Sequence, residues 1–313
     1  MEQAVTHWVE HVALPGRRIV DARRLTGGYS NENTALTTDD GHRYVLRRYL
    51  RHNKCALEAA LADRLKGTAP VPEVVAADPT GDSVGEPLLL STFVAGLPVG
   101  EILAAGDDAE LGRDVGATLA RIGTIAFEAP GFFADGLRPD GSEPTVGLDQ
   151  FVERCLREGN AAGHLTAAEQ DALLRYAAGA AADLAAVKGS RQLVHSDYNP
   201  KNLLAARSAT GRWRVAAVLD WEFAFSSTPL VDVGNMLRDP RPPAFLDGFL
   251  SGFRDAGGDL PPGWRRISQA ADLFALADFL TRPVEHRYFR RSIDRIRDLV
   301  GAQAGTNVRR DRM

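Results

Sequence analysis

Two short stretches of the chain carry residues whose types and spacing can perform chemistry. In the first, His195 is followed by Asp197 and, five positions further on, by Asn202. In the second, the apolar run at residues 215–219 ends on Asp220. A carboxylate that accepts a proton, a nearby amide and a second carboxylate at a strand end can hold a divalent metal on nucleotide phosphates while a hydroxyl attacks the terminal one. The pattern therefore predicts phosphoryl transfer.

Each of these residues suits one part of that reaction. Asp197 can orient and deprotonate the acceptor hydroxyl. Asn202 and Asp220 offer the hard oxygen ligands that Mg²⁺ prefers. Taken singly, Asp197 fits a turn cap, Asn202 a turn and Asp220 the end of a strand. Together, in the strand–loop–strand context that the chemistry requires, they favour catalysis over these structural explanations.

The spacing His-x-Asp-x-x-x-x-Asn, followed by an apolar strand that ends in Asp-Trp-Glu, resembles the catalytic stretch of the aminoglycoside phosphotransferase and choline kinase family, relatives of the protein kinases. The resemblance extends through most of the chain. It implies an α+β, bilobal protein-kinase-like fold. A small antiparallel β-rich lobe at residues 1–94 would bind nucleotide, and a larger, mainly helical lobe at residues 95–313 would carry the catalytic loop and the acceptor site.

The resemblance also implies roles for residues around the motif. His195 would brace the catalytic loop without transferring protons, and Asp232 would support the same loop through hydrogen bonds. Glu222 stands where the family often has a second acid, so it either reaches the metal or only supports the loop. The carbonyl of Thr92 and the N–H of Val94 would bind the adenine edge at a hinge, with a plain domain linker as the alternative.

The N-terminal part has the pattern of an antiparallel β-meander. Alternating residues and turn signals predict three consecutive strands, at residues 19–25, 34–38 and 42–50. The turn after the first strand contains Gly27 and Gly28, which allow backbone N–H groups to approach phosphate oxygens closely. Gly27, Gly28, Ser30 and Asn31 are therefore candidates to cover the phosphates, although an ordinary hairpin turn explains the glycine pair by itself.

The third predicted strand carries Arg47 at the position where kinases have a lysine that binds the phosphates. Arginine keeps the charge and offers a planar, bidentate donor group to phosphate. The resemblance places Glu58, on a predicted helix that follows, where it would hold this cation. The structural alternatives are a solvated arginine at a strand end and a surface glutamate.

The rest of the chain has predominantly helical patterns. Thr166 and Glu169 form a capping box ahead of a long helix. The arginine-rich helix predicted at residues 283–301 is best interpreted as a solvated basic face. An acid-rich run is suited to a cationic acceptor, but also to any solvated surface; it comprises Asp135, Asp140, Glu143, Asp149, Glu153 and Glu158. Lys201, directly before Asn202, has no assigned role.

Composition excludes several classes of protein. The 313 residues have a net charge of −4, which implies no general affinity for nucleic acid. No apolar run approaches the length of a membrane span, and the first residues lack a secretory signal pattern. Two cysteines give no disulfide framework and fit a reducing, cytoplasmic location. A monomer or a homodimer is expected.

These observations predict an enzyme that uses ATP and Mg²⁺ to phosphorylate a hydroxyl of a small molecule; GTP is not excluded as the donor. By analogy with the family, the acceptor is expected to be an antibiotic, such as an aminoglycoside or a basic cyclic peptide. The alternatives are a kinase of choline, a sugar, an amino sugar or another primary metabolite, and a nucleotide-binding pseudokinase. Arg47 in place of lysine motivates the pseudokinase, whereas intact Asp197, Asn202 and Asp220 argue against it.

Overall fold

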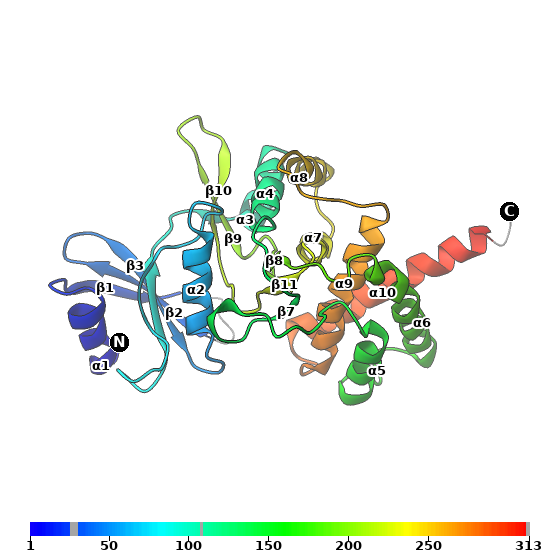
Figure 1. Ribbon diagram of the computed structural model, residues 1–313, viewed down its shortest axis with the longest axis horizontal. Coiled ribbons are helices and arrows are strands. Elements are labelled where there is room, and N and C mark those ends of the chain that lie inside the picture. The colour runs from blue at the N-terminus through cyan, green and yellow to red at the C-terminus, as the bar shows by residue number, and fades with distance from the viewer. Residues whose placement is uncertain (26–30, 107–108, 311–313) are drawn as a thin grey trace.

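The computed structural model describes residues 1–25, 31–106 and 109–310 of the chain. An antiparallel sheet occupies the N-terminal part, and helices dominate the C-terminal part (Figure 1). This arrangement confirms the predicted α+β class. None of the helices in these ranges is both long and apolar enough to cross a membrane.

The N-terminal sheet has five strands in the order β1-β2-β3-β5-β4, and all neighbours are antiparallel. The predicted meander forms its first three strands. Their bounds are β1 (Ile19–Arg24), β2 (Asn31–Thr38), β3 (Arg43–Tyr49), β4 (Val74–Asp78) and β5 (Leu88–Thr92).

The two faces of this sheet have different roles. Helix α1 (Gln3–Trp8) and the π-helix η1 (Val9–Ala13) pack against one face, where Leu46 is buried with Leu36 and Leu90. Because side chains alternate along a strand, Arg47 points to the opposite face. That face is covered by α2 (Cys55–Leu65), as Figure 1 shows, and α2 carries Glu58. The alternation of β3 therefore aims one cation at α2.

The C-terminal part consists mainly of helices, with two short 3₁₀ turns, η2 (Asp135–Leu137) and η3 (Phe279–Thr281). The predicted capping box is present, since the Thr166 side chain accepts from the Glu169 N–H and the Glu169 carboxylate accepts from the Thr166 N–H. The helices are α3 (Val99–Ala104), α4 (Ala109–Ile122), α5 (Leu148–Glu158), α6 (Ala167–Ala185), α7 (Leu230–Leu237), α8 (Pro243–Asp255), α9 (Trp264–Asp278) and α10 (Arg287–Arg310).

Helices α4 and α8 cross at very short range. A Cβ added at Gly116 would lie 2.0 Å from the carbonyl oxygen of Phe249, and one added at Gly252 would lie 1.9 Å from that of Arg113. Only glycine allows this backbone contact. The pair also supports the site, because the Tyr198 hydroxyl donates a hydrogen bond of 2.8 Å to the carbonyl of Val115 on α4.

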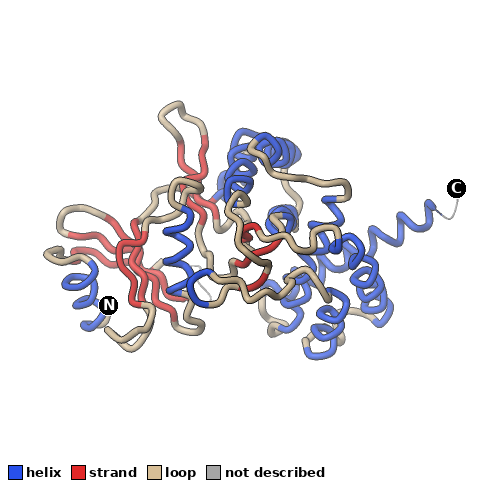
Figure 2. The backbone as a smooth tube through the Cα atoms, viewed as in Figure 1, coloured by secondary structure: helices blue, strands red, loops and turns tan. Residues whose placement is uncertain are grey.

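Two small sheets frame the segment with the catalytic motif (Figure 2). One has the order β7-β11-β8, with β7 (Gly131–Phe132), β11 (Phe225–Ser227) and β8 (Gln192–Val194). The other has the order β10-β9-β6, with β10 (Trp213–Val218), β9 (Leu203–Arg207) and β6 (Leu97–Pro98). The motif therefore leaves one sheet at the end of β8 and enters the other at the start of β9.

The chain passes from the N-terminal sheet to the C-terminal part at residues 93–96. Strand β5 ends at Thr92, and the next strand, β6, already pairs with β9 of the C-terminal part. The proposed division between residues 94 and 95 falls inside this connection.

Candidate active site

A buried carboxylate holds the loop that follows β8 by accepting hydrogen bonds from its backbone. Asp232, on the first turn of α7, accepts hydrogen bonds from the backbone N–H groups of His195 (2.7 Å) and Ser196 (2.8 Å). Burial raises the pKa of the Asp232 carboxyl to about 7, although both N–H groups act in the opposite direction. The geometry is that of a support for the loop, which is the role predicted for Asp232.

His195 uses both ring nitrogens inside the protein. Its Nδ1 accepts from the Asp197 N–H at 3.1 Å, so the proton must lie on Nε2, which donates to the carbonyl of Leu219 at 2.9 Å. The ring is fully buried against Trp221, and burial lowers the pKa of His195. A neutral imidazole with both nitrogens occupied fixes the backbone and leaves no site for proton transfer, in line with the predicted bracing role.

Two residues of the site have left-handed backbone conformations without being glycine. Ser196 has φ of 71° and Asp220 has φ of 70°. Such conformations are uncommon for non-glycine residues and cluster at functional sites, where surrounding contacts hold them. Here they turn the chain directly before Asp197 and at Asp220 itself.

The Asp197 carboxylate is surrounded by nitrogen donors. Asn199 donates to Oδ1 at 2.6 Å, and Asn202 donates to Oδ2 at 2.8 Å. Lys201 places its Nζ 3.0 Å from Oδ2. Since the Asn202 amide nitrogen is used in this way, its Oδ1 is the atom left to accept or to ligate. The sequence motif identified Asp197 and Asn202, but Asn199 and Lys201 were not assigned to this carboxylate.

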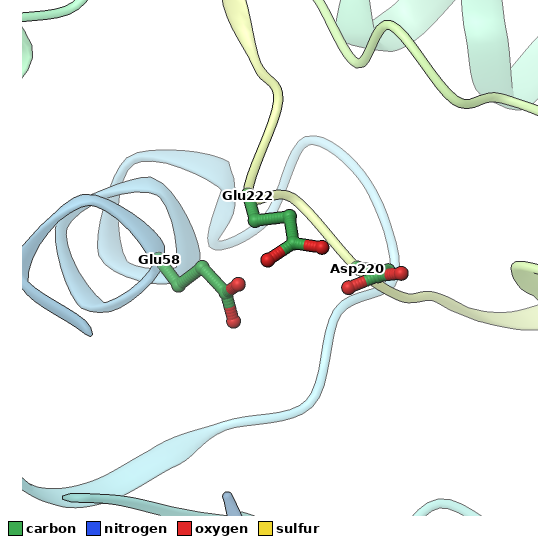
Figure 3. Close-up of side chains that lie close together, drawn as sticks. All are labelled: Glu58, Asp220 and Glu222. Carbon is green, nitrogen blue, oxygen red and sulfur yellow. The ribbon is translucent and has the colours of Figure 1, made fainter. Parts of the chain in front are cut away.

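Three carboxylates converge beside this loop. Oxygen atoms of Glu58, Asp220 and Glu222 lie within 4.8 Å of one another, and Figure 3 shows the side chains pointing to a common space. Arg47 enters the group from β3, with 2.6 Å to Asp220, 3.1 Å to Glu58 and 3.6 Å to Glu222. The predicted pair of Arg47 and Glu58 is therefore present, whereas the contacts of Arg47 with Asp220 and Glu222 were not foreseen.

Burial and mutual repulsion perturb these acids. Burial raises the pKa of Glu58 to about 7, and Arg47 lowers it only in part. Burial also raises the pKa of Glu222, and the charge of Asp220 adds to this effect. Burial alone would lower the pKa of Arg47, but Glu58 and Asp220 raise it overall, so the guanidinium stays charged. Perturbed groups that share one space are typical of functional sites.

Two further side chains complete this group. Asn31, at the start of β2, donates from Nδ2 to Glu222 at 3.0 Å. The hydroxyl of Tyr49 donates to Glu58 at 2.9 Å. Asn31 was predicted to be near the phosphates, while Tyr49 was not singled out. Its signal was available, because it lies two positions after Arg47 and therefore on the same face of β3.

The residues present fit a magnesium ion. Three carboxylates face a single guanidinium, which leaves the group with an excess of negative charge. Their ligand atoms are the hard oxygens that Mg²⁺ prefers, and the amide oxygen of Asn202 on the catalytic loop is of the same kind. Asn202 is also tied to the strand end, because its carbonyl accepts from the Leu219 N–H at 2.8 Å.

The remaining predicted nucleotide-binding residues are placed as follows. Thr92 ends β5, and Val94 lies in the connection that follows it. Gly27, Gly28 and Ser30 lie outside the described residues. The adenine and phosphate contacts of these five residues stay predictions.

Comparison with known proteins identifies the family. The family model of the phosphotransferase enzyme family matches residues 21–269, which include the carboxylate group, the catalytic loop and α7. This chain belongs to the phosphotransferase enzyme family. A search of curated proteins gives no match.

Solved structures of this kind share the fold. An aminoglycoside phosphotransferase in ternary complex with AMP-PNP and hygromycin B is 18% identical, with a TM-score of 0.69, and the match covers 97% of this chain and 100% of that one. The macrolide 2′-phosphotransferase of Brachybacterium faecium is 18% identical, with a TM-score of 0.66 and coverage of 94% and 96%. A protein described as a fructosamine-3-kinase from Thermobifida fusca is 17% identical, with a TM-score of 0.62 and coverage of 90% and 94%. The protein-kinase-like prediction is confirmed.

Proposed function

We propose that this phosphotransferase moves the γ-phosphate of ATP to a hydroxyl group of a small molecule. The observation that carries the proposal is the position of Asp197. Its carboxylate is oriented by Asn199 and Asn202 on a braced loop, and Asn202 is bonded to the strand that leads to Asp220. This is the arrangement of a base and metal ligands that phosphoryl transfer needs.

In the proposed reaction, the acceptor oxygen forms a bond to the γ-phosphorus, and the bond from that phosphorus to the β–γ bridging oxygen breaks. The acceptor proton passes to the Asp197 carboxylate, and ADP leaves with the bridging oxygen. Magnesium, when bound by Asp220, Asn202 and Glu222, supplies charge neutralisation on the phosphates. Positioning and charge carry most of the rate in such transfers, because the protein has little covalent chemistry to perform.

Arg47 is proposed to bind the phosphates, with Glu58 holding its guanidinium in place. Both side chains are largely buried, at 13% and 11% exposure, so the pair has a defined geometry. Thr92 and Val94 are proposed to bind adenine. Asn31 and the glycine segment before it are proposed to cover the phosphates. GTP is an alternative donor that the proposal leaves open.

Two acceptor classes follow from the family. The first is an antibiotic, such as an aminoglycoside or a basic cyclic peptide, and it is supported by the antibiotic phosphotransferases among the similar structures. The second is a primary metabolite such as choline, a sugar or an amino sugar, and it is supported by the similar fructosamine-3-kinase. The intact Asp197, Asn202 and Asp220 favour either enzyme over a pseudokinase.

The test is magnesium-dependent ADP release across a panel of aminoglycosides, macrolides, peptide antibiotics, choline, sugars and hydroxy acids. Removing the base in Asp197→Ala is expected to lower kcat about 10²- to 10⁴-fold. Asp63→Ala is the matched control, since that carboxylate is 80% exposed on α2. Nucleotide binding without any turnover, with Asp197→Ala equal to wild type, would instead support a pseudokinase.

A further inference from the structure

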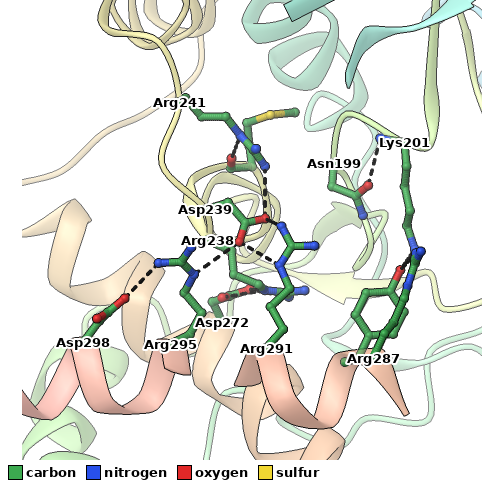
Figure 4. Close-up of polar contacts among 12 residues, drawn as sticks. Asn199, Lys201, Arg238, Asp239, Arg241, Asp272, Arg287, Arg291, Arg295 and Asp298 are labelled. Carbon is green, nitrogen blue, oxygen red and sulfur yellow. Dashed lines mark hydrogen bonds and ion pairs between the residues drawn. The ribbon is translucent and has the colours of Figure 1, made fainter. Parts of the chain in front are cut away.

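A cluster of basic side chains lies beside the catalytic loop (Figure 4). We define the basic cluster by its members on three segments: Lys201 from the catalytic loop, Arg238 and Arg241 from the segment after α7, and Arg287, Arg291 and Arg295 from α10. Arginine and lysine rarely gather in this way without an anionic partner, because like charges repel.

Lys201 connects the basic cluster to the proposed base. Its Nζ lies 3.0 Å from Asp197 and 3.1 Å from the hydroxyl of Tyr288, on the first turn of α10. Arg287 also donates to the Tyr288 hydroxyl, at 2.6 Å. A continuous series of contacts therefore runs from the catalytic carboxylate to the exposed side of α10, where Arg291 follows one turn after Tyr288.

Around Asp239, the arginines outnumber the carboxylates that contact them. Among the described residues, Asp239 is approached by three guanidinium groups: Arg291, Arg295 at 3.3 Å and Arg241 at 3.6 Å. Asp298 pairs with Arg295 at 2.9 Å. Two carboxylates thus face three arginines.

The neighbouring pair of Arg238 and Asp272 supplies no additional negative charge to these arginines. Asp272 is already engaged by Arg238, which donates to both of its oxygens, and by Asn235. The pKa of Arg241 is lowered, chiefly by burial, and the charges of Arg291, Arg238 and Arg295 add to this effect against the attraction of Asp239. A group whose positive charge is disfavoured in this way would gain from an added anion.

The cluster lies within reach of a small acceptor. Asp232 supports the catalytic loop at one end of α7, and Asp239 follows the other end, seven residues later. Lys201 links the two regions more directly, because its Nζ contacts both Asp197 and the Tyr288 hydroxyl, and Arg291 follows Tyr288 by three residues, a rise of about 4.5 Å along α10. A hydroxyl at Asp197 and a charged group at the basic cluster can therefore belong to one sugar-sized molecule.

We propose that the acceptor carries an anionic group, a carboxylate or a phosphate, which binds Lys201, Arg287 and Arg291 while its hydroxyl meets Asp197. The proposal rests on the function proposed above and narrows its acceptor class. Arginine donors in a planar fork suit either anion. A polycationic acceptor would meet repulsion at this side of the site.

The acid-rich run that was considered for a cationic acceptor has fewer available carboxylates than its composition indicates. Asp140 already accepts hydrogen bonds from the backbone of Phe132 and from Ser142, and Glu143 accepts from the Gly189 N–H. Glu158 pairs with Arg157 at 3.0 Å. These carboxylates are engaged by neighbouring groups that fix local loops and a helix end. They therefore do not form an acidic binding surface for a cationic acceptor.

The experiment compares sugar-sized acceptors of different charge, together with one larger cationic antibiotic. ADP release is measured with gluconate, glucose 6-phosphate, glucose, glucosamine and hygromycin B, and binding of the same compounds is titrated in the presence of AMP-PNP. The variants are Arg291→Ala, the conservative Arg291→Lys and the control Arg290→Ala. Arg290 is also exposed on α10, but it lies about 100° around the helix from Arg291. Thermal melting verifies that each variant folds.

The proposal expects kcat/KM or affinity for gluconate or glucose 6-phosphate to exceed that for glucose at least tenfold. Arg291→Ala should lower kcat/KM or affinity for the anionic compound about 10- to 100-fold, mainly through KM, as expected when a hydrogen bond to a charged group is lost. Arg291→Lys should retain most of the wild-type affinity for the anionic compound, and Arg290→Ala should match wild type. A preference for the phosphate over the carboxylate, or the reverse, identifies the anion.

Turnover that favours glucose, glucosamine or hygromycin B, or equal effects of Arg291→Ala and Arg290→Ala, would overturn the anionic acceptor and leave the phosphotransferase function standing. Absence of ADP release with every compound would count against the proposed function. In that case the titration still decides the inference, because anion binding weakened by Arg291→Ala supports it and equal binding of anionic and neutral compounds overturns it.

Discussion

The catalytic loop and the arginines of the basic cluster that surround Asp239 lie at opposite ends of α7, and they are held in different ways. The loop is fixed by hydrogen bonds from backbone groups to fully buried side chains, Asp232 and His195. The basic cluster is fixed mostly by ion pairs between side chains, and Arg291 remains 51% exposed. The catalytic loop therefore has a defined geometry, whereas the basic cluster has positive charge on side chains that can change position.

The difference follows from the work proposed for each region. A proton-accepting carboxylate must lie within hydrogen-bond reach of the reacting hydroxyl, so its loop needs buried support. A binding surface for an anion needs favourable potential, and exposed arginines can adjust to the ligand. Buried polar contacts are costly to break, whereas exposed ion pairs contribute little. The predictions below test this contrast.

The largest effect is expected where the basic cluster contains a buried pair. Arg238 is 13% exposed and bonded to Asp272, which is 5% exposed. Asp272→Ala leaves a buried guanidinium without its partner and is expected to reduce the free energy of unfolding by about 3–5 kcal/mol. Denaturant unfolding measures the loss. A change below about 1 kcal/mol would show that this pair behaves like an exposed one.

The next effect is expected at the support of the catalytic loop. Asp232→Ala removes the acceptor of two backbone N–H groups, each worth about 1–3 kcal/mol when left unsatisfied. We expect kcat to fall at least tenfold, with a smaller change in the KM for ATP, because the loop that aims Asp197 loosens. Steady-state kinetics on the folded variant check this, and an unchanged kcat would separate loop support from catalysis.

Asp239→Asn is the matched change in the basic cluster. Burial acts to raise the pKa of Asp239, but Arg291 and the other arginines lower it overall. An acid with a lowered folded-state pKa stabilises the protein above its ordinary pKa and loses this contribution as the pH falls below about 4. Asp239→Asn is therefore expected to cost about 1 kcal/mol or less at pH 7 and nothing at low pH, as measured by denaturant unfolding at several pH values.

The smallest effect is expected at Lys201. Its ion pair with Asp197 joins side chains that are 45% and 19% exposed, so solvent screens it. Lys201→Met should change kcat less than about tenfold and should raise the KM for an anionic acceptor more than that for a neutral one. A loss of kcat as large as that of Asp197→Ala would place Lys201 in the chemical step itself.

Much of the active site could be predicted from sequence because its parts are local. The spacing from His195 to Asn202 places both within one loop, and the apolar strand before Asp220 ends where the chemistry needs an acid. Alternation along β3 aims Arg47 at the face that α2 covers, whereas its pairing with Glu58 was expected only from the family resemblance. The inferences from spacing and alternation concern residues whose relation is fixed by hydrogen bonding or periodicity over a few positions.

The basic cluster was not predictable in the same way. Its arginines on α10 were interpreted as a solvated face, yet Arg291 and Arg295 meet Asp239 more than fifty positions earlier in the chain. Likewise, Tyr288 meets Lys201 from a helix 87 positions further on. Contacts of this kind depend on how α7, α9 and α10 pack together, and no spacing within a short segment encodes them.

The sequence by itself determined the α+β class, the spacing of the motif residues from His195 to Asn202 and the face of β3 that carries Arg47, because strand alternation, helix capping and loop spacing act locally. Only the tertiary structure decided that Asp220 and Glu222 join Arg47, which backbone groups Asp232 binds, and that α10 brings Tyr288 to Lys201 beside Asp197. Those contacts form when distant segments bury their apolar faces against one another. Polar side chains at the edges of these interfaces then contact residues that cannot be identified from the local sequence.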